Sequence, residues 1–276
     1  MSYPAATWRL LSEPYPRPGP LNMAIDEAVL RAVAAGKAPP TLRLYAWSPP
    51  TLTLGRGQPY ADADLAELRR HGVTLVRRMT GGTAVLNRDE LSYMVAVTDQ
   101  EPRFSAVNIV ESYRGLSGAF LHALKMLGLT RARADGRGPQ EPRRSSRAER
   151  TPVCFEIPLD YEVTVGERKL IGSAQMRVRG GILQHGSMPL TGDLGDISQF
   201  LVARPDPDRI RSLALTLYEA LGQLVTWEEA AEAMVIGFQE ALNLELVPSP
   251  LLPLERQRVE ELVAEKYGNP SWTARV

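Results

Sequence analysis

Residues 169–189 read KLIGSAQMRVRGGILQHGSMP, and this stretch indicates which kind of sheet the chain builds. Lys169–Val178 and Ile182–Pro189 are strand-like runs joined by Gly180-Gly181, a pair that suits a tight hairpin turn. A third run, Tyr161–Val165, precedes them, with another glycine between. The three runs therefore predict an antiparallel meander.

Strand-like and helical runs alternate upstream of this meander. Helical spacing of apolar residues and helix-stop glycines predict three helices, at Leu21–Ala35, Asp64–His71 and Asn108–Leu127. The period changes to that of strands at Thr41–Trp47, Thr51–Leu54, Val73–Arg78 and Leu91–Val97. The last of these is nearly apolar throughout, which is typical of a central strand. In the first helix we expect Asn22 to be the cap and Gly36 to be the stop.

After Asp193 the pattern becomes helical only. The predicted helices are Pro207–Gly222, Thr226–Leu242 and Pro253–Lys266, and Thr226 followed by Glu229 forms a capping box. We therefore expect an α+β catalytic domain over residues 1–200, with a mixed, largely antiparallel sheet flanked by helices. Residues 201–276 are expected to form a small helical extension packed on it.

The composition excludes several classes of function. Thirty-two basic residues balance thirty-two acidic ones, so a global attraction to nucleic acid or to an anionic membrane is not expected. A single cysteine excludes an internal disulfide and a metal site made of several thiolates. The first twenty residues lack the basic and apolar segments of a secretory signal, and no apolar run approaches bilayer length. These features predict a cytoplasmic protein.

The first candidate site is the run Arg77-Arg78-Met79-Thr80-Gly81-Gly82-Thr83, which follows a predicted strand. Adjacent glycines have no Cβ to obstruct a ligand, and their exposed N–H groups can hold an anion. Arginine forks can bind phosphate or carboxylate oxygens. A plain hairpin turn with surface arginines is the other interpretation. The run is not a P-loop, because no Gly-Lys-Ser/Thr follows.

The second candidate is Cys154. A lone cysteine in an apolar setting is most often a small buried hydrophobic residue. Residues 131–150 immediately before it contain seven arginines and no large apolar residue, and we interpret them as a mobile loop. Nearby positive charge lowers the pKa of a thiol, and the thiolate is the nucleophile. The pattern leaves both interpretations open.

The third candidate combines Lys169 and Gly172-Ser173-Ala174-Gln175 with Gln184-His185-Gly186-Ser187. A lysine on a strand that leads into small residues can direct its charge at a ligand that approaches the backbone closely. His185 is the histidine best placed for acid–base work. A hairpin with a solvated lysine is the alternative.

Together these motifs resemble the biotin/lipoate protein ligase family over residues 8–200. The matching segments occur in the family's order: Trp8-Arg9-Leu10-Leu11, Asn22–Glu27, Leu42–Trp47, Leu52–Arg56, Arg77–Val85, Lys169–Gln175 and Gln184–Ser187. The resemblance implies a tunnel that holds a medium-chain acyl group, with Lys169 against the acyl carbonyl or its adenylate. The residues expected to bind the substrate are Arg77, Arg78, Thr80, Gly81, Gly82, Thr83, Gly172, Ser173, Ala174, Gln175, His185 and Gly186.

Within that family the chain is most similar to the cysteine-dependent octanoyltransferases, which carry a Cys-Phe pair upstream of the lysine strand, here Cys154-Phe155. The resemblance implies that the Cys154 thiolate attacks octanoyl-acyl carrier protein to give an acyl-enzyme. A lysine of a lipoyl domain, or of a glycine-cleavage H-type protein, then takes the acyl group. Lys169 would polarise the carbonyl or stabilise the oxyanion. This reaction requires neither ATP nor a metal.

Two residues depart from the family pattern. Asn87 stands where the glycine loop commonly ends in a histidine, and Met94 replaces a small hydroxylated residue. These departures leave two other hypotheses open. One is an ATP- and Mg-dependent lipoate-protein ligase that acts through an acyl-adenylate, and the other is a non-catalytic acyl-binding protein.

Overall fold

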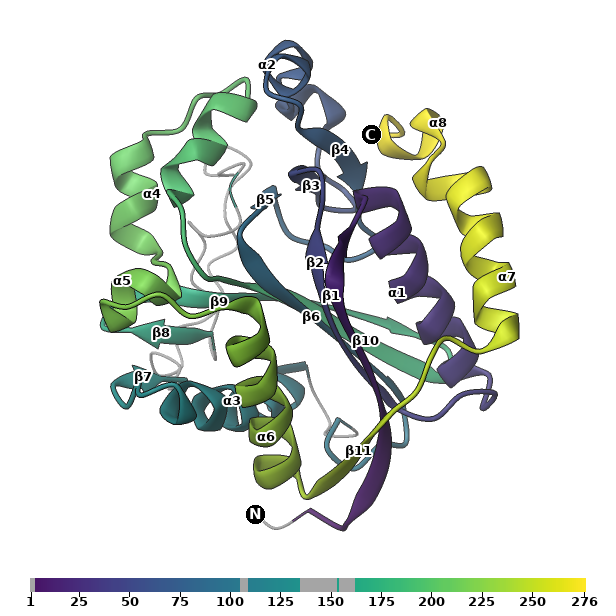
Figure 1. Ribbon diagram of the computed structural model, residues 1–276. Coiled ribbons are helices and arrows are strands. Elements are labelled where there is room, and N and C mark those ends of the chain that lie inside the picture. Colours follow the sequence, from purple (N-terminus) through teal and green to yellow (C-terminus); the bar gives the residue numbers. More distant parts are fainter. Residues whose placement is uncertain (1–2, 105–108, 135–152, 154–161) are drawn as a thin grey trace.

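The computed structural model describes residues 3–104, 109–134, 153 and 162–276. Its largest feature is an eight-stranded sheet in the order β11-β1-β2-β6-β10-β9-β8-β7 (Figure 1). Its strands are β1 (Ala6–Arg17), β2 (Thr41–Trp47), β6 (Glu90–Thr98), β7 (Ala132–Arg133), β8 (Val163–Val165), β9 (Arg168–Val178), β10 (Gly181–Pro189) and β11 (Leu244–Pro248). β1 is parallel to both of its neighbours, and the other pairs are antiparallel. The predicted fold class, α+β with a mixed and largely antiparallel sheet, is confirmed.

The meander forms as predicted. β9 and β10 pair from Gly181↔Val178 to Ser187↔Gly172, and β10 pairs with β6 on its other side. Gly166 and Gly180 take positive φ values at the two turns, which glycine adopts without a Cβ clash. The apolar strand predicted at Leu91–Val97 is β6, which lies between β2 and β10. Burial on both faces explains its composition.

A second, three-stranded sheet carries the arginine–glycine run. Its order is β4 (Thr74–Arg77), β3 (Thr51–Leu54) and β5 (Val85–Asn87), with β3 in the middle. β3 is parallel to β4 and antiparallel to β5. Residues 78–84 connect β4 to β5 across the end of β3, so the chain turns back there through its glycines.

Helices cover both faces of the large sheet (Figure 1). The bounds are α1 (Gly19–Ala34), α2 (Leu65–Arg70), α3 (Ile109–Met126), α4 (Pro207–Leu213), α5 (Leu217–Leu221), α6 (Trp227–Leu242), α7 (Pro253–Leu262) and α8 (Pro270–Thr273). Short 3₁₀ helices lie at Tyr60–Asp62 and Leu194–Phe200, and a π-helical segment lies at Val263–Tyr267. One apolar core lies between the sheet and the pair α3 and α6, and a second lies beneath α1 and α7. None of the described helices has the length and apolar character of a membrane span.

The first helix differs from its prediction. α1 begins at Gly19 with Pro18 as its N-cap, so Asn22 is not the cap. Asn22 is instead buried, and its side-chain nitrogen donates to the carbonyl oxygens of Arg17 and Ala46. The expected stop is confirmed, since Gly36 follows the helix at a φ of 66°.

Four further features of the secondary structure differ from the expectations. β1 was not expected, and the short strand β11 contradicts a helices-only chain after Asp193. The helix expected at Pro207–Gly222 is two helices, α4 and α5, separated at Ala214. Within the segment expected to be a loop, Ala132–Arg133 form β7. The rest of that segment, residues 135–150, lies outside the described residues.

The C-terminal segment is tied to the start of the chain. β11 pairs with β1 from Ala6↔Leu244 to Leu10↔Pro248. The guanidinium of Arg9 donates to both carboxylate oxygens of Glu255 on α7, at 2.7 and 2.6 Å, and both side chains are buried. The division into domains at residue 200 stays a prediction.

Candidate active site

A narrow pocket opens where the two sheets meet the start of α1. Its walls come from α1, β2, β3, β5, β6, β9, β10 and the residue after β4. The lining residues are Met23, Tyr45, Trp47, Thr53, Arg78, Val85, Asn87, Ser92, Gly172, Ser173, Ala174, His185, Gly186 and Ser187. Apolar and aromatic side chains alternate with hydroxyls, one guanidinium and one imidazole. This lining suits an apolar chain with a polar end.

The two adjacent arginines have different surroundings. Arg77 is fully buried, and its guanidinium donates to the backbone carbonyls of Thr273, Gly55 and Gln58. It does not line the pocket, so the geometry favours a structural role over ligand binding. Burial and the nearby charge of Arg275 lower its pKa.

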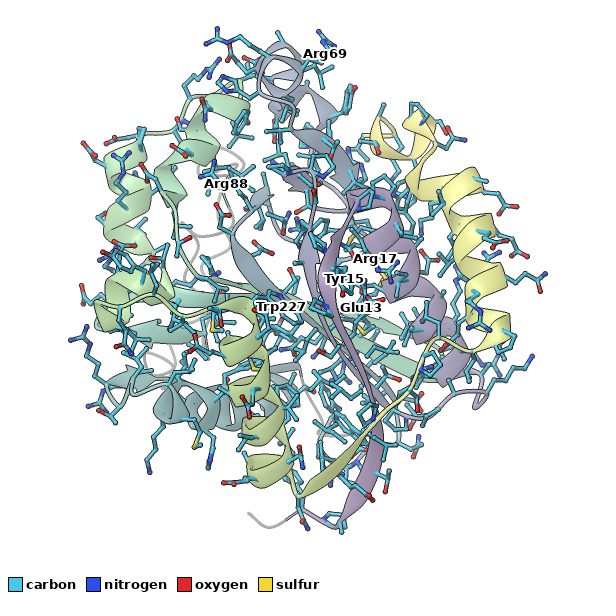
Figure 2. All side chains as sticks on the ribbon, viewed as in Figure 1. Glu13, Tyr15, Arg17, Arg69, Arg88 and Trp227 are labelled. Carbon is cyan, nitrogen blue, oxygen red and sulfur yellow. The ribbon has the colours of Figure 1, made fainter. Side chains whose placement is uncertain are left out.

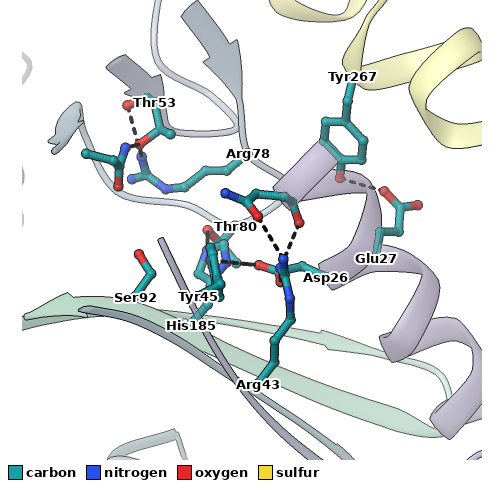
Figure 3. A network of polar contacts seen from close by, with 12 residues as sticks. Asp26, Glu27, Arg43, Tyr45, Thr53, Arg78, Thr80, Ser92, His185 and Tyr267 are labelled. Carbon is teal, nitrogen blue, oxygen red and sulfur yellow. Dashed lines mark hydrogen bonds and ion pairs between the residues drawn. The ribbon is translucent and has the colours of Figure 1, made fainter. Parts of the chain in front are cut away.

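Arg78 lines the pocket and supports the glycine turn. One of its terminal nitrogens donates to the carbonyl oxygens of Gly81 and Thr83, at 2.9 and 2.7 Å. The other contacts the carbonyl and hydroxyl oxygens of Thr53 (Figure 3). Gly81 and Gly82 are exposed, and Gly82 has a φ of 86°. The Arg78 guanidinium therefore fixes the shape of the glycine turn through its bonds to these backbone carbonyls.

A buried chain of polar side chains connects the turn to α1. The Thr80 hydroxyl lies 2.7 Å from Nε2 of His185, and Nδ1 of His185 lies 3.0 Å from a carboxylate oxygen of Asp26 (Figure 3). Asp26 also accepts from the guanidinium of Arg43 at 2.7 Å and from the hydroxyl of Tyr45 at 3.2 Å. All five residues are buried. Because the carboxylate accepts from Nδ1–H, a neutral His185 has Nε2 free to accept the Thr80 proton.

Glycines on β9 and β10 bring the backbone close to the pocket. A Cβ at Gly186 would lie 2.1 Å from the carbonyl oxygen of Gly172 and 2.6 Å from the ring of Tyr93. The Ser173 hydroxyl lies 2.6 Å from the hydroxyl of Tyr93. Ala174 also lines the pocket, and Ser173 and Gly186 are paired across the two strands.

Gln175 does not line the pocket but contacts side chains that lie behind its wall. Its amide nitrogen donates to the side-chain oxygen of Gln184 at 3.1 Å, and Gln184 donates in turn to the Tyr93 hydroxyl at 3.0 Å. Gln175 therefore supports the pocket wall indirectly, through Gln184 and Tyr93.

Lys169 is buried on β9, where its ammonium is ion-paired with the carboxylate of Glu162. Its carbonyl oxygen accepts from the backbone N–H of Leu215. Lys169 does not line the pocket. The expectation of a solvated hairpin lysine is thus wrong, while contact with an acyl carbonyl stays a prediction.

Cys154 lies outside the described residues. Its neighbour Val153 is described, and it forms an isolated parallel β-bridge with Ala84. The Val153 side chain is fully buried in the core below the small sheet. The residue that precedes the cysteine is therefore anchored directly beside the end of the Arg77–Thr83 run.

The two departures from the family pattern occupy different places. Asn87 lines the pocket, and its amide nitrogen donates to the carbonyl oxygens of Thr51 and Val85 and to the Thr53 hydroxyl. Met94 is buried in the core beneath α1. Asn87 thus borders the ligand space, whereas Met94 packs behind it.

Three residues of the site have no role in the sequence prediction: Asp26, which lies behind the pocket wall, and Tyr45 and Trp47, which line the pocket from β2. Trp47 donates to the Ser92 hydroxyl, and Ser92 donates to the carboxylate of Glu90. Burial raises the pKa of Glu90 to about 7. The available signal in the sequence was an acidic residue directly before the apolar run of β6. Among the described residues no group of histidine, cysteine or carboxylate side chains could hold a metal ion.

The fold and this pocket are typical of enzymes that attach acyl groups to proteins. A family model, the lipoyl protein ligase A/B catalytic domain, matches residues 18–239, and the chain belongs to that family. Its curated relatives include the octanoyltransferase LipM of Symbiobacterium thermophilum, which is 39% identical over 97% of this chain and 98% of that protein. The LipM of Kyrpidia tusciae is 41% identical over 98% and 99%. The resemblance seen in the sequence is confirmed.

Solved structures support the fold. The lipoate protein ligase of a Thermoplasma acidophilum lipoylation system superposes with a TM-score of 0.76 at 24% identity, covering 99% of this chain and 97% of that one. A lipoate-protein ligase A bound with ATP gives 0.77 at 24% identity, covering 98% and 99%. At this identity the similarity defines the fold alone.

Proposed function

We propose that this chain transfers an octanoyl group from an acyl carrier protein to a lysine of a lipoyl domain. The observation that carries the proposal is its similarity, over nearly its whole length, to octanoyltransferases of the LipM type. The pocket supports it, because Met23, Tyr45, Trp47 and Val85 offer an apolar lining. Burial of a saturated chain contributes about 0.8 kcal/mol per CH₂, which favours a medium-chain acyl group over a short one.

In the first step the Cys154 thiolate attacks the thioester carbonyl carbon of the donor. The tetrahedral oxyanion collapses, the bond to the carrier's sulfur breaks, and the carrier leaves as a thiol once it takes a proton. The product is an octanoyl thioester on Cys154. A positively charged neighbour favours the thiolate and the oxyanion alike, and Lys169 is the buried cation proposed for this role.

In the second step the neutral amine of the acceptor lysine attacks the Cys154 thioester. The C–S bond breaks, the amine loses a proton, and the amide forms while the thiolate is regenerated. The energy of the thioester drives amide formation, so the proposed reaction uses neither ATP nor a metal. The buried set Asp26, His185 and Thr80 holds the glycine turn beside the acyl group during both steps.

The acyl donor is proposed to be octanoyl-acyl carrier protein, and the acceptor a lipoyl domain or a glycine-cleavage H-type protein. A cytoplasmic location stays a prediction from the sequence.

The deciding experiment is intact-mass measurement after incubation with octanoyl-acyl carrier protein. We expect an adduct of one octanoyl group on the wild-type chain and none on Cys154→Ala. Adding a lipoyl domain should discharge the adduct and acylate one lysine of that domain. If Cys154→Ala transfers octanoate at the wild-type rate, the proposal fails. ATP–pyrophosphate exchange that depends on octanoate or lipoate would instead indicate a ligase.

A further inference from the structure

A second and larger cavity, of about 580 Å³, lies on the side of α1 that faces the C-terminal helices. Its floor is apolar and is made by Leu30, Ala34, Met79, Met176 and Val178. These residues come from α1, from the residues after β4 and from the end of β9. We call this feature the basic groove, because of the side chains that surround it.

Five cations surround the groove against one carboxylate: Arg31, Arg56, Arg179, Lys266 and Arg275, with Glu27. Glu27 is already engaged, since Lys266 donates to it at 2.5 Å and Arg31 is ion-paired with it. Burial lowers the pKa of Lys266, and the bond to Glu27 opposes that change. The lining therefore carries a clear excess of positive charge, in a chain whose overall charge is balanced.

Three of the arginines, Arg56, Arg179 and Arg275, present exposed side chains to a partner, although Arg275 also donates from Nη2 to the carbonyl oxygen of Arg56 at 3.3 Å. Within the described part of the chain, no hydrogen bond or ion pair joins the side chain of Arg56 or Arg179 to another residue. Arg275 stacks over the ring of Trp272, with 3.9 Å between the guanidinium carbon and the ring centroid. Clustered charges above an apolar floor raise the local concentration of an anionic, partly apolar ligand.

The groove lies beside the acyl pocket, and neighbouring residues of the same segments line the two. Met79, in its floor, precedes Thr80, whose hydroxyl contacts His185 in the pocket wall. Met176 follows Ala174 of the pocket by two positions on β9, a spacing of about 7 Å along a strand. A flexible arm anchored in the groove would thus reach the pocket.

We propose, on the basis of the function proposed above, that the basic groove is the docking site of the carrier-protein donor. Its arginines would receive the phosphodiester of the donor's acyl-bearing arm and the acidic surface beside it. The group that each partner delivers differs in charge. The acceptor delivers a lysine, and an ammonium group approaching this groove meets like charges, whereas the donor's arm delivers an anion joined to an acyl thioester.

The test is the double substitution Arg56→Glu with Arg179→Glu. We expect the Kd of the unacylated carrier protein, measured by calorimetry, to rise about tenfold or more and to lose most of its salt dependence. The KM for the octanoyl-carrier donor should rise in parallel. The rate of acylation by octanoyl-pantetheine, which lacks the phosphate and the protein, should stay unchanged. Arg69→Glu, which reverses one exposed arginine on α2 far from the groove lining (Figure 2), is the control and should change none of these values.

An unchanged Kd for the carrier in the double variant would overturn the docking proposal. So would a KM that rises for the lipoyl domain and not for the donor. Binding and chemistry are measured separately: if the carrier binds through the groove but octanoyl-acyl carrier protein leaves no adduct on the wild-type chain, the transferase function fails and the docking site stands.

Discussion

Nδ1 of His185 lies 3.0 Å from a carboxylate oxygen of Asp26, although 159 residues separate them in the sequence. One residue is on α1 and the other on β10, and the contact crosses the core between them (Figure 3). On the far side of the imidazole, Nε2 contacts the Thr80 hydroxyl. Asp26 therefore determines which nitrogen of His185 faces the glycine turn.

We predict that Asp26→Asn lowers both stability and activity. The substitution removes a buried carboxylate that faces Arg43 and His185. Arg43 keeps its ion pair with Glu13, so we expect the cost to stay below the roughly 3–5 kcal/mol of a buried charge left without any partner. Displacement of the turn should also lower kcat/KM about tenfold to a hundredfold. Urea unfolding and single-turnover transfer measure the two effects. Asp208→Asn is the control, since its side chain is 87% exposed, and it should lower neither. Wild-type transfer by Asp26→Asn would refute the positioning role.

A second prediction concerns pH and Glu90. Its carboxyl has a pKa raised to about 7 by burial, so the folded chain binds a proton there that the unfolded chain has lost above pH 4.5. Stability should therefore fall as pH rises from about 4.5 to about 7, by up to roughly 3 kcal/mol, and then stay level. Glu90→Gln removes this dependence, so its stability relative to wild type should increase over the same interval.

Urea midpoints of wild type and Glu90→Gln between pH 5 and pH 8 check this expectation. Glu228→Gln changes an exposed glutamate on α6 and should leave the pH dependence as it is. A constant difference between wild type and Glu90→Gln at every pH would contradict the assignment. Ser92 links Glu90 to Trp47 in the pocket wall, so transfer activity is expected to depend on the same ionisation.

Sequence patterns within a few residues of each other predicted those elements of the fold whose formation depends on neighbouring residues. The glycine turns of the meander and the apolar run of β6 follow from backbone freedom and burial. The sequence did not predict β1, because Pro14 and Pro16 lie within this strand, at the point where its register with β2 shifts. Proline is tolerated there because the regular ladder of hydrogen bonds is already interrupted.

Long-range partners could not be predicted in the same way. β11 is short and pairs in parallel with a strand more than two hundred residues earlier, and the alternation of Leu244 and Leu246 was its one signal. The candidate site shows the same limit. The run of arginines and glycines after a predicted strand indicated that Arg77 and Arg78 were important. Only the folded structure places Arg77 among backbone carbonyls and Arg78 in the pocket wall.

We predict that Gly186→Ala disrupts the pocket wall. The new Cβ would lie 2.1 Å from a backbone oxygen of Gly172, a contact that requires β9 and β10 to separate. Overpacking of this kind costs about 1–3 kcal/mol, and octanoyl transfer should fall with it. Gly118→Ala on α3 is the matched control, because nothing lies within 4 Å of its Cβ position. That substitution should stabilise the helix by up to about 1 kcal/mol. Equal effects of the two substitutions on thermal unfolding would contradict this argument.

Glu255→Ala should be among the most destabilising single substitutions on the C-terminal helices. It leaves the buried guanidinium of Arg9 without its bidentate partner and removes a bond to the backbone N–H of Leu252. Breaking a buried pair costs about 3–5 kcal/mol. Glu261→Ala removes an exposed pair with Arg258 on the same helix and should leave the urea midpoint close to that of wild type. Urea unfolding should show one transition, shifted in Glu255→Ala alone, because Arg9 lies on a strand of the central sheet. A separate early transition in Glu255→Ala would show instead that the C-terminal segment unfolds independently of that sheet.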